Sequence, residues 1–368
     1  MNINAANRSY EIWLDKQTPL NKKDLQKKYK KMSDDPASFL RATFFRWVQI
    51  WPDICRDLVA APGVLAIGDL HIENFGTWRD SEGRLVWGIN DFDEAFTMPY
   101  VIDLVRLAAS YRLAAPVSGK AWLKPGDACA RIIDGYHDAL KAGGRAFVLQ
   151  AKNDWLRSLA EANLKNPTLF YNDFEQGLTR ANQSNVPPAI AKILKATLPP
   201  GSKVTGFAAR AAGKGSLGRQ RFVVLADCDG GQIVREAKAL ADSGWLWANP
   251  VKRKSEIYYD QILRSAVRSP DPFLRVIDRW ITRRLAGDCI KVELGKLKLV
   301  PVESDMLYAM GWETGNIHLG SGNAIKAIQN DLKKRPADWL RTASKLMAEA
   351  TVRDWQDWKK THKTTTPA

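Results

Sequence analysis

Two short apolar segments of the chain, at 64–67 and 85–89, each run directly into a cluster of acidic and amide side chains. The first segment reads VLAI and is followed by GDLHIEN, and the second reads LVWGI and is followed by NDFDE. Short apolar runs of this kind are typical of buried strands. Two strands that each end in carboxylates can direct both acidic groups to the same place. We therefore expect the rest of the chain to fold around this stretch, residues 64–95.

The spacing within the two clusters is typical of a phosphoryl-transfer site. Asn74 follows Asp69 by five positions, and Asp91 begins an Asp-Phe pair after the second strand. In that layout the first Asp accepts the proton of the attacking hydroxyl, while the Asn and the second Asp bind Mg²⁺ on the nucleotide phosphates. The alternative is a β-hairpin with solvated acids at its ends. We favour the site, because such hairpins rarely carry His, Glu, Asn and Asp at both ends.

Composition places the chain among ordinary globular proteins of two or three domains. It has 368 residues, of which 45% are hydrophobic and 26% are charged. No apolar run approaches the ~20 residues that cross a bilayer, and the polar N-terminus lacks the apolar core of a signal peptide. We therefore expect a cytoplasmic protein with no membrane partner. The four cysteines are scattered without metal-ligand spacing.

The net charge of +15 permits two interpretations. It can attract nucleic acid, nucleotide phosphates or an acidic substrate, or it can simply be a solubilising basic surface. Lys and Arg are spread along the whole chain without a recognition motif. We favour the solubilising surface and regard nucleic acid as the less favoured partner.

Helices are predicted on both sides of the acidic stretch. Residues 1–60 form an N-terminal helical segment, in which Arg41 and Arg46 lie within an aromatic run, SFLRATFFRWVQIWPDI. The aromatics favour core packing, whereas an arginine near a phosphate site can reach an anion. The apolar spacing of 101–108 predicts a helix with Asp103 in its first turn, where a carboxylate is favoured. Asp103 could equally support the 68–74 loop from behind.

Proline and glycine signals at 187–188 and 199–201 mark a boundary after which the pattern becomes β. We assign residues 61–200 to a helical catalytic lobe, 201–300 to a β-rich nucleotide-binding lobe and 301–368 to C-terminal helices that pack on the catalytic lobe. Near the end of one of these helices lies His318, for which a structural role is favoured over a role in a site.

Three strands are predicted in the β-rich lobe, around 204–211, 221–226 and 232–238. The loop between the first two is Gly213-Lys214-Gly215-Ser216-Leu217-Gly218, which lets backbone N–H groups approach phosphates closely. A strand follows this loop instead of a helix, so the dinucleotide-fold context is absent and the kinase type is favoured. That type needs a basic residue on the third strand, for which Arg235 and Lys238 are candidates. It also needs a later Glu, for which Glu256 is preferred to Glu236.

The chain also resembles a known family in two blocks, GDLHIENFGTW…INDFDEA…DLVRLAAS and GKGSLGRQRFVVL…VREAKA. Together they are similar to the bacterial domain-of-unknown-function family 2252, over roughly residues 35–350. The first block also looks like that of aminoglycoside phosphotransferases and other protein-kinase-like enzymes. This resemblance implies a catalytic base at Asp69, Mg²⁺ ligands at Asn74 and Asp91 with Asp93 as an auxiliary ligand, and Asp103 as a support for the catalytic loop. The candidate catalytic residues are Asp69, His71 and Asp103.

The resemblance implies an α+β, protein-kinase-like fold of two lobes in permuted order. Ordinary kinase-like chains place the glycine loop first, whereas here the catalytic block precedes it by more than a hundred residues. The family usually has Lys-Glu-Ala where this chain has Arg235-Glu236-Ala237. Because residues 235 and 238 point to opposite faces of a strand, only one of them can meet the phosphates.

These observations predict an ATP- and Mg²⁺-dependent phosphotransferase that acts on a hydroxyl of an acceptor. Two alternatives stand beside it. One is adenylyl transfer on the same fold, and the other is a non-catalytic protein that binds nucleotide or nucleic acid.

Overall fold

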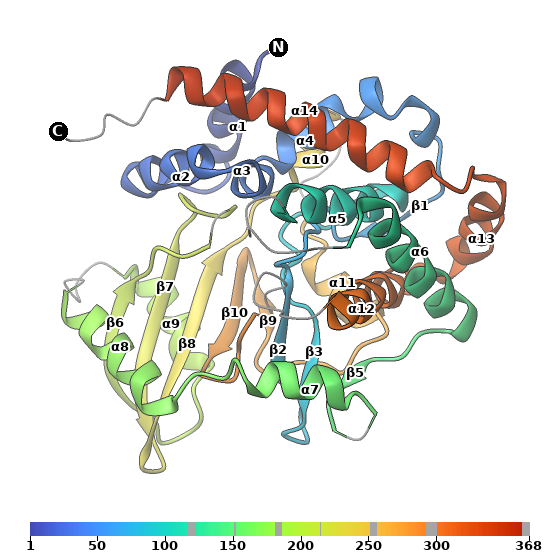
Figure 1. Ribbon diagram of the computed structural model, residues 1–368. Helices are drawn as coiled ribbons and strands as arrows, with labels where there is room; N and C mark the ends of the chain where they lie inside the picture. Colours follow the sequence, from blue (N-terminus) through green and yellow to red (C-terminus); the bar gives the residue numbers. More distant parts are fainter. Residues whose placement is uncertain are drawn as a thin grey trace.

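The computed structural model describes residues 1–115, 123–150, 152–180, 186–213, 215–250, 256–291 and 300–362. The fold is α+β, as predicted. Figure 1 shows a twisted sheet on one side of the molecule, a large group of helices on the other, and the strands of the acidic stretch between them.

Four helices form the N-terminal segment: α1 (Ile3–Asp15), α2 (Lys22–Asp34), α3 (Pro36–Ala42) and α4 (Phe44–Ile54). A 3₁₀ turn, η1 (Arg56–Leu58), follows them. Each of the first three begins at a side-chain cap, in which Asn2, Asn21 and Asp35 accept hydrogen bonds from backbone N–H groups of the first turn. The predicted helical character of this segment is therefore confirmed. The last helix, α14 (Trp339–Thr361), crosses these helices at the top of Figure 1 and contacts α1 to α4.

The acidic stretch forms two small antiparallel sheets. Strand β1 (Gly63–Ala66) pairs with β4 (Phe96–Pro99), and β3 (Leu85–Ile89) pairs with β2 (Phe75–Arg79) and β5 (Phe147–Val148). The two predicted apolar strands therefore exist, but they belong to different sheets. The two acidic clusters follow β1 and β3 directly, and the backbone N–H of Asn90 donates to the carbonyl oxygen of Asn74 at 3.2 Å.

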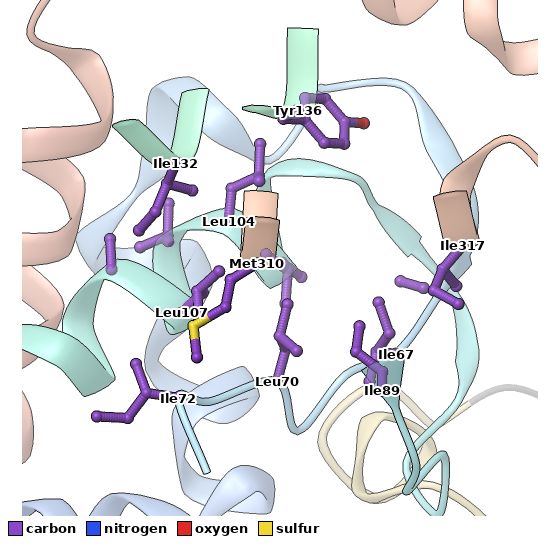
Figure 2. Close-up of a cluster of buried hydrophobic side chains, with 14 of the residues drawn as sticks. Ile67, Leu70, Ile72, Ile89, Leu104, Leu107, Ile132, Tyr136, Met310 and Ile317 are labelled. Carbon is purple, nitrogen blue, oxygen red and sulfur yellow. The ribbon is translucent and has the colours of Figure 1, made fainter. Parts of the chain in front are cut away.

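A helical core supports these strands. It is built on α5 (Val101–Ala114), α6 (Pro125–Ala142) and α12 (Val300–His318), which contact one another, while α14 packs on α5. Figure 2 shows how apolar side chains from the strand ends and these helices meet. The core includes Ile67 and Ile89, the last residues before the two clusters, and both are almost fully buried. Apolar packing therefore holds the base of each cluster.

The larger sheet contains five antiparallel strands in the order β6-β7-β8-β10-β9. These are β6 (Lys203–Ala209), β7 (Arg221–Cys228), β8 (Gly231–Ala239), β9 (Arg275–Ile277) and β10 (Trp280–Leu285). One face packs against α8 (Pro167–Arg180) through Tyr171 and Phe174, and the other against α9 (Pro188–Ala196) through Ile190 and Leu194. The remaining helices are α7 (Asp154–Glu161), α10 (Gly244–Ala248), α11 (Tyr259–Ser265), η4 (Gly322–Ala324) and α13 (Ile325–Lys334). The three strands predicted around 204–211, 221–226 and 232–238 are confirmed.

None of the helices in the described ranges is both long and apolar enough to span a membrane.

Two independent constraints require a glycine at position 68, in the turn after β1. Its φ is +83°, a conformation that L side chains rarely adopt. A Cβ placed on it would also lie 2.5 Å from the carbonyl oxygen of Glu94. The turn that presents the first acidic cluster therefore packs directly against the backbone of Glu94, the last residue of the second cluster.

We predict that Gly68→Ala destabilises the protein much more than Gly83→Ala. Gly83 has a similar φ of +71°, but a Cβ at that position would meet nothing within 4 Å. The control should lose about 1 kcal/mol from backbone strain alone, and Gly68→Ala should lose at least about 2 kcal/mol more because backbone must move. Urea unfolding of both variants measures the difference, and equal losses would contradict the close packing.

Candidate active site

A cavity of about 280 Å³ lies where the acidic stretch meets the five-stranded sheet. Side chains of both acidic clusters line it on one side. The loop at 213–218 and the strands β7, β8 and β10 line the other, and α1 to α4 close one end. Segments more than a hundred residues apart in the chain therefore meet in one space.

Asp103 holds the first cluster from behind. Its carboxylate accepts hydrogen bonds from the backbone N–H groups of Ile67 and Gly68, both at 2.8 Å. The Nε2 of His318 lies 2.9 Å from the same carboxylate, and its Nδ1 lies 2.9 Å from the hydroxyl of Tyr136. The side chains of Asp103, His318 and Tyr136 are fully buried. Asp103 is therefore outside the cavity and has the supporting position that we considered for it.

Asp69 points into the cavity and is paired with Arg106. The Nε of Arg106 donates to its Oδ1 at 2.9 Å, and Nη2 contacts the same oxygen. The guanidinium is fully buried between the rings of Phe44 and Trp47, 5.2 and 5.0 Å from their centroids. Burial raises the pKa of Asp69, and Arg106 only partly opposes this effect. The result is an oriented carboxylate with increased affinity for a proton, as a general base requires.

Asn74 ties the two clusters together. Its Nδ2 donates to the carbonyl oxygen of Asp69 at 3.3 Å and to that of Asp91 at 3.1 Å. Both donors of the side-chain amide are used in this way, so its Oδ1 remains as an acceptor or metal ligand.

Lys238 joins the second cluster to the sheet. It is fully buried on β8, and its Nζ lies 3.3 Å from both carboxylate oxygens of Asp91 and also contacts Asp93. Burial acts to raise the pKa of Asp91, but Lys238 and Arg283 outweigh it and hold that pKa well below its ordinary value. Burial and the neighbouring Asp91 raise the pKa of Asp93. Of these two carboxylates, Asp91 is thus the one that its neighbours hold in the charged form.

The other two candidates from the nucleotide lobe lie elsewhere. Arg235 is on the opposite face of β8, where its Nε donates to the carbonyl oxygen of Thr197 and its guanidinium lies over the ring of Phe273. Glu256 lies outside the cavity lining and accepts a hydrogen bond from the hydroxyl of Tyr258. The structure therefore brings Lys238, and neither of these two, to the acidic clusters.

Glu236 occupies the face of β8 that Lys238 shares. Its buried carboxylate accepts from Arg221 at 2.9 Å and Arg283 at 3.0 Å, and it also contacts Arg210. Burial would raise the pKa of Glu236, but the three guanidinium groups hold it well below its ordinary value. This Glu organises a row of arginines on the sheet instead of pairing with the lysine.

The glycine loop touches the first acidic cluster. A Cβ on Gly215 would lie 3.5 Å from the Oδ2 of Asp69 and only 2.5 Å from the carbonyl oxygen of Arg41. The hydroxyl of Ser216 accepts from Nη2 of Arg221 at 2.5 Å. Gly213 and Gly218 have positive φ, and the carbonyl oxygen of Gly218 accepts from the N–H of Asn21 on the N-terminal segment. The predicted contact at Lys214 lies outside the described residues.

His71 lines the cavity as a neutral ring. Its Nδ1 accepts a hydrogen bond from the backbone N–H of Glu73 at 3.1 Å, which assigns the proton to Nε2. Burial, then the charges of Arg41 and Lys291, hold the pKa of His71 well below its ordinary value. His71 is therefore a hydrogen-bond donor at neutral pH, not a cation.

Several basic residues of the site were missed in the sequence, among them Arg106, Arg219, Lys28 and Lys291. Arg106 was inside the quoted DLVRLAAS motif, one helical turn after Asp103, and this spacing could have indicated it. Arg219 was inside the glycine-loop block and pairs with Asp93 at 3.2 Å and Glu94 at 3.1 Å. Lys28 and Lys291 line the cavity from distant segments, and no sequence signal marked them.

The residues at the second cluster suit Mg²⁺. Among the described residues no group of three His, Cys, Asp or Glu side chains forms a metal site. Mg²⁺, however, commonly takes one or two carboxylates together with phosphates and water. Asp91 and Asp93 supply two carboxylates and Asn74 an amide oxygen, and the buried Oδ1 of Asp93 has no hydrogen-bond partner within the described part of the chain. The donor set therefore fits a Mg²⁺ ion that also binds phosphate.

We predict that Lys238→Met destabilises the protein and makes its stability respond to Mg²⁺. Removing the buried cation leaves two adjacent carboxylates, which should cost about 3–5 kcal/mol. Thermal unfolding with and without millimolar MgCl₂ should show a larger rise in Tm for this variant than for the wild type. Arg235→Met, on the other face of the same strand, is the control. An equal response to Mg²⁺ in all three proteins would contradict a metal site at these carboxylates.

Glu313 on α12 lies directly behind β3. Its Oε1 accepts from the N–H of Ile89 at 3.2 Å, and its Oε2 accepts from Asn316 at 2.7 Å. Burial raises the pKa of Glu313 to about 7, although these hydrogen bonds and Arg268 oppose the rise. The strand that carries the second cluster is therefore hydrogen-bonded to a carboxyl group whose pKa is near neutral.

We predict that the wild type loses stability as pH rises from 5 to 8, relative to Glu313→Gln. The folded protein holds the proton up to about pH 7, whereas the unfolded chain releases it near its ordinary pKa. The folded state therefore binds more protons between these values, and raising the pH favours unfolding by up to about 3 kcal/mol. Urea unfolding at both pH values tests this. A parallel pH dependence of the two proteins would contradict it.

Comparison with known proteins gave one match. Neither the curated proteins nor the solved structures yielded a match to this chain. Residues 21–186, which contain the N-terminal helices α2 to α4, both acidic clusters and Asp103, match a family described as "Uncharacterized protein conserved in bacteria (DUF2252)".

Proposed function

We propose that the protein is an ATP- and Mg²⁺-dependent phosphotransferase with a protein-kinase-like site whose two halves occur in permuted chain order. The observation that carries the proposal is the contact of Lys238 with Asp91 and Asp93. A lysine of the sheet meets the predicted Mg²⁺ ligands, and a sheet lysine, a glycine loop and such ligands are the recurring parts of kinase-type phosphoryl-transfer sites.

The residues divide the work of such a reaction between them. The loop at 213–218 would cover the phosphates with backbone N–H groups, and Lys238 would neutralise phosphate charge from the sheet. Asp91, with Asn74 and Asp93, would hold Mg²⁺, which supplies electrostatic stabilisation of the charge on the transferring group. Asp69 would orient the acceptor hydroxyl and take its proton, with Arg106 holding the carboxylate in place.

We predict different losses for two substitutions in this set. Asp91→Asn should weaken Mg²⁺-dependent ATP binding by at least about tenfold, because a charged metal ligand is lost. Asp69→Asn should leave ATP affinity nearly unchanged but slow ATP hydrolysis or transfer by about 10²–10⁴-fold, because it removes the base. Calorimetric titration with ATP and release of γ-labelled phosphate measure the two effects.

Asp305→Asn is the matched control, because this aspartate is largely exposed on α12. ATP binding that ignores both Mg²⁺ and Asp91 would overturn the proposal. Incorporation of label from α-labelled ATP, with none from γ-labelled ATP, would replace it with adenylyl transfer. Strongly salt-dependent binding of RNA or DNA that neither substitution affects would favour a non-catalytic binding protein.

A further inference from the structure

The cavity contains a second group of polar side chains that the proposed chemistry does not use. Arg41, at the end of α3, and Lys291, after β10, line it together with the neutral His71. The charge of Arg41 acts on both Asp69 and Lys291, whereas Lys238 and Arg283 come from the sheet. A ligand that binds Arg41 and Lys291 has to match their positive charge.

Arg41 is buried, but only some of its hydrogen-bond donors have partners. Its Nη1 pairs with Glu73, whose side chain is 35% exposed. Its Nε is buried and has no hydrogen-bond partner among the described residues. A buried guanidinium N–H without a partner is costly, so a ligand oxygen in the cavity would be favoured there. The backbone of Arg41 also contacts Gly215, so the side chain lies beside the glycine loop and Asp69.

Lys291 is held in place by its own backbone. The residue bridges to Gly76 on β2, and the preceding Ile290 accepts from the N–H of Thr77 at 2.9 Å. Its side chain is exposed to the cavity, and no carboxylate of the described residues lies within salt-bridge distance of it. Desolvation by the surrounding walls, and then the charge of Arg41, lower the pKa of Lys291 to about 8. Two cations thus face the same space, and among the described residues only Arg41 of the two is paired with a carboxylate, that of Glu73.

We propose that the phosphoryl acceptor carries an anionic group, a phosphate or a carboxylate, beside its reactive hydroxyl, and that Arg41 and Lys291 bind this group. The inference rests on the proposed function, because it assigns the anion to the hydroxyl-bearing substrate. The Nε2–H of His71 supplies a third, neutral donor. Arg41 lies beside Asp69, so an acceptor whose anionic group Arg41 holds presents its hydroxyl to the base. The nucleotide phosphates are met by the glycine loop, which borders Arg41 and Asp69, and by Lys238 from the sheet.

The test compares small molecules that differ only in the anionic group. Glycerol 3-phosphate, glycerate and glycerol are titrated calorimetrically into the full-length protein, with Mg²⁺ and either ADP or a non-hydrolysable ATP analogue. Glycerol 3-phosphate or glycerate should bind and glycerol should not. Arg41→Gln and Lys291→Gln should each weaken this binding by at least about tenfold, the loss of one hydrogen bond to a charged group.

Two exposed basic residues provide matched controls, Arg264→Gln and Lys345→Gln, and neither should change the affinity. Lys291→Gln keeps the test decisive if Arg41→Gln does not fold, because Lys291 is exposed. Equal binding of glycerol and the two anions would overturn the inference. A second outcome would also overturn the inference: the ATP analogue competes with the anionic probes, and Arg41→Gln weakens binding of the analogue but not of ADP. Arg41 and Lys291 would then bind the γ-phosphate of the nucleotide.

The two proposals fail in different ways in these titrations. Loss of any response to ATP and Mg²⁺, with the anionic probes still bound at Arg41 and Lys291, would overturn the phosphotransferase proposal. Normal ATP binding without binding of either anionic probe would overturn the inference about the acceptor alone.

Discussion

The buried contact of Lys238 with Asp91 and Asp93 is the interaction on which the arrangement of the site depends. It is a direct charge contact between the centre of the five-stranded sheet and the second acidic cluster. A buried ammonium needs a carboxylate partner, and adjacent buried carboxylates need a cation. The lysine therefore needs the two carboxylates and the carboxylates need the lysine. This contact holds the sheet against the second acidic cluster, and the cavity lies beside it. Arg219 strengthens the same junction by pairing with Asp93 and Glu94.

The first acidic cluster depends on a different kind of support. Asp103 satisfies the N–H groups of the turn at Ile67 and Gly68, and His318 and Tyr136 continue the hydrogen-bonded chain into α12 and α6. Buried backbone donors need partners, so the turn cannot shift without breaking this chain. A rigid base and a charged junction together leave Asp69, Asn74 and Asp91 in a defined geometry around one space.

Local patterns predicted much of this fold. The helices of the N-terminal segment, the apolar strands before the two clusters and three strands of the larger sheet are all present, because the patterns that predict them act over a few residues. The partners of those strands were not predicted, since β1 and β3 pair with β4 and β2 through contacts that periodicity does not encode. Glu256 was preferred to Glu236 by analogy of position, and burial among three arginines is what distinguishes Glu236.

The sequence by itself determined which residues form the two acidic clusters, and that residues 235 and 238 must point to opposite faces of their strand. Alternation along a strand is a local property of the backbone. Only the tertiary structure decided which face meets the acids, because that depends on how the sheet docks on the helical core. It also decided that Arg41 and Arg106 lie beside Asp69 and that Lys291 lines the same cavity, because charges from distant segments are brought together only by packing.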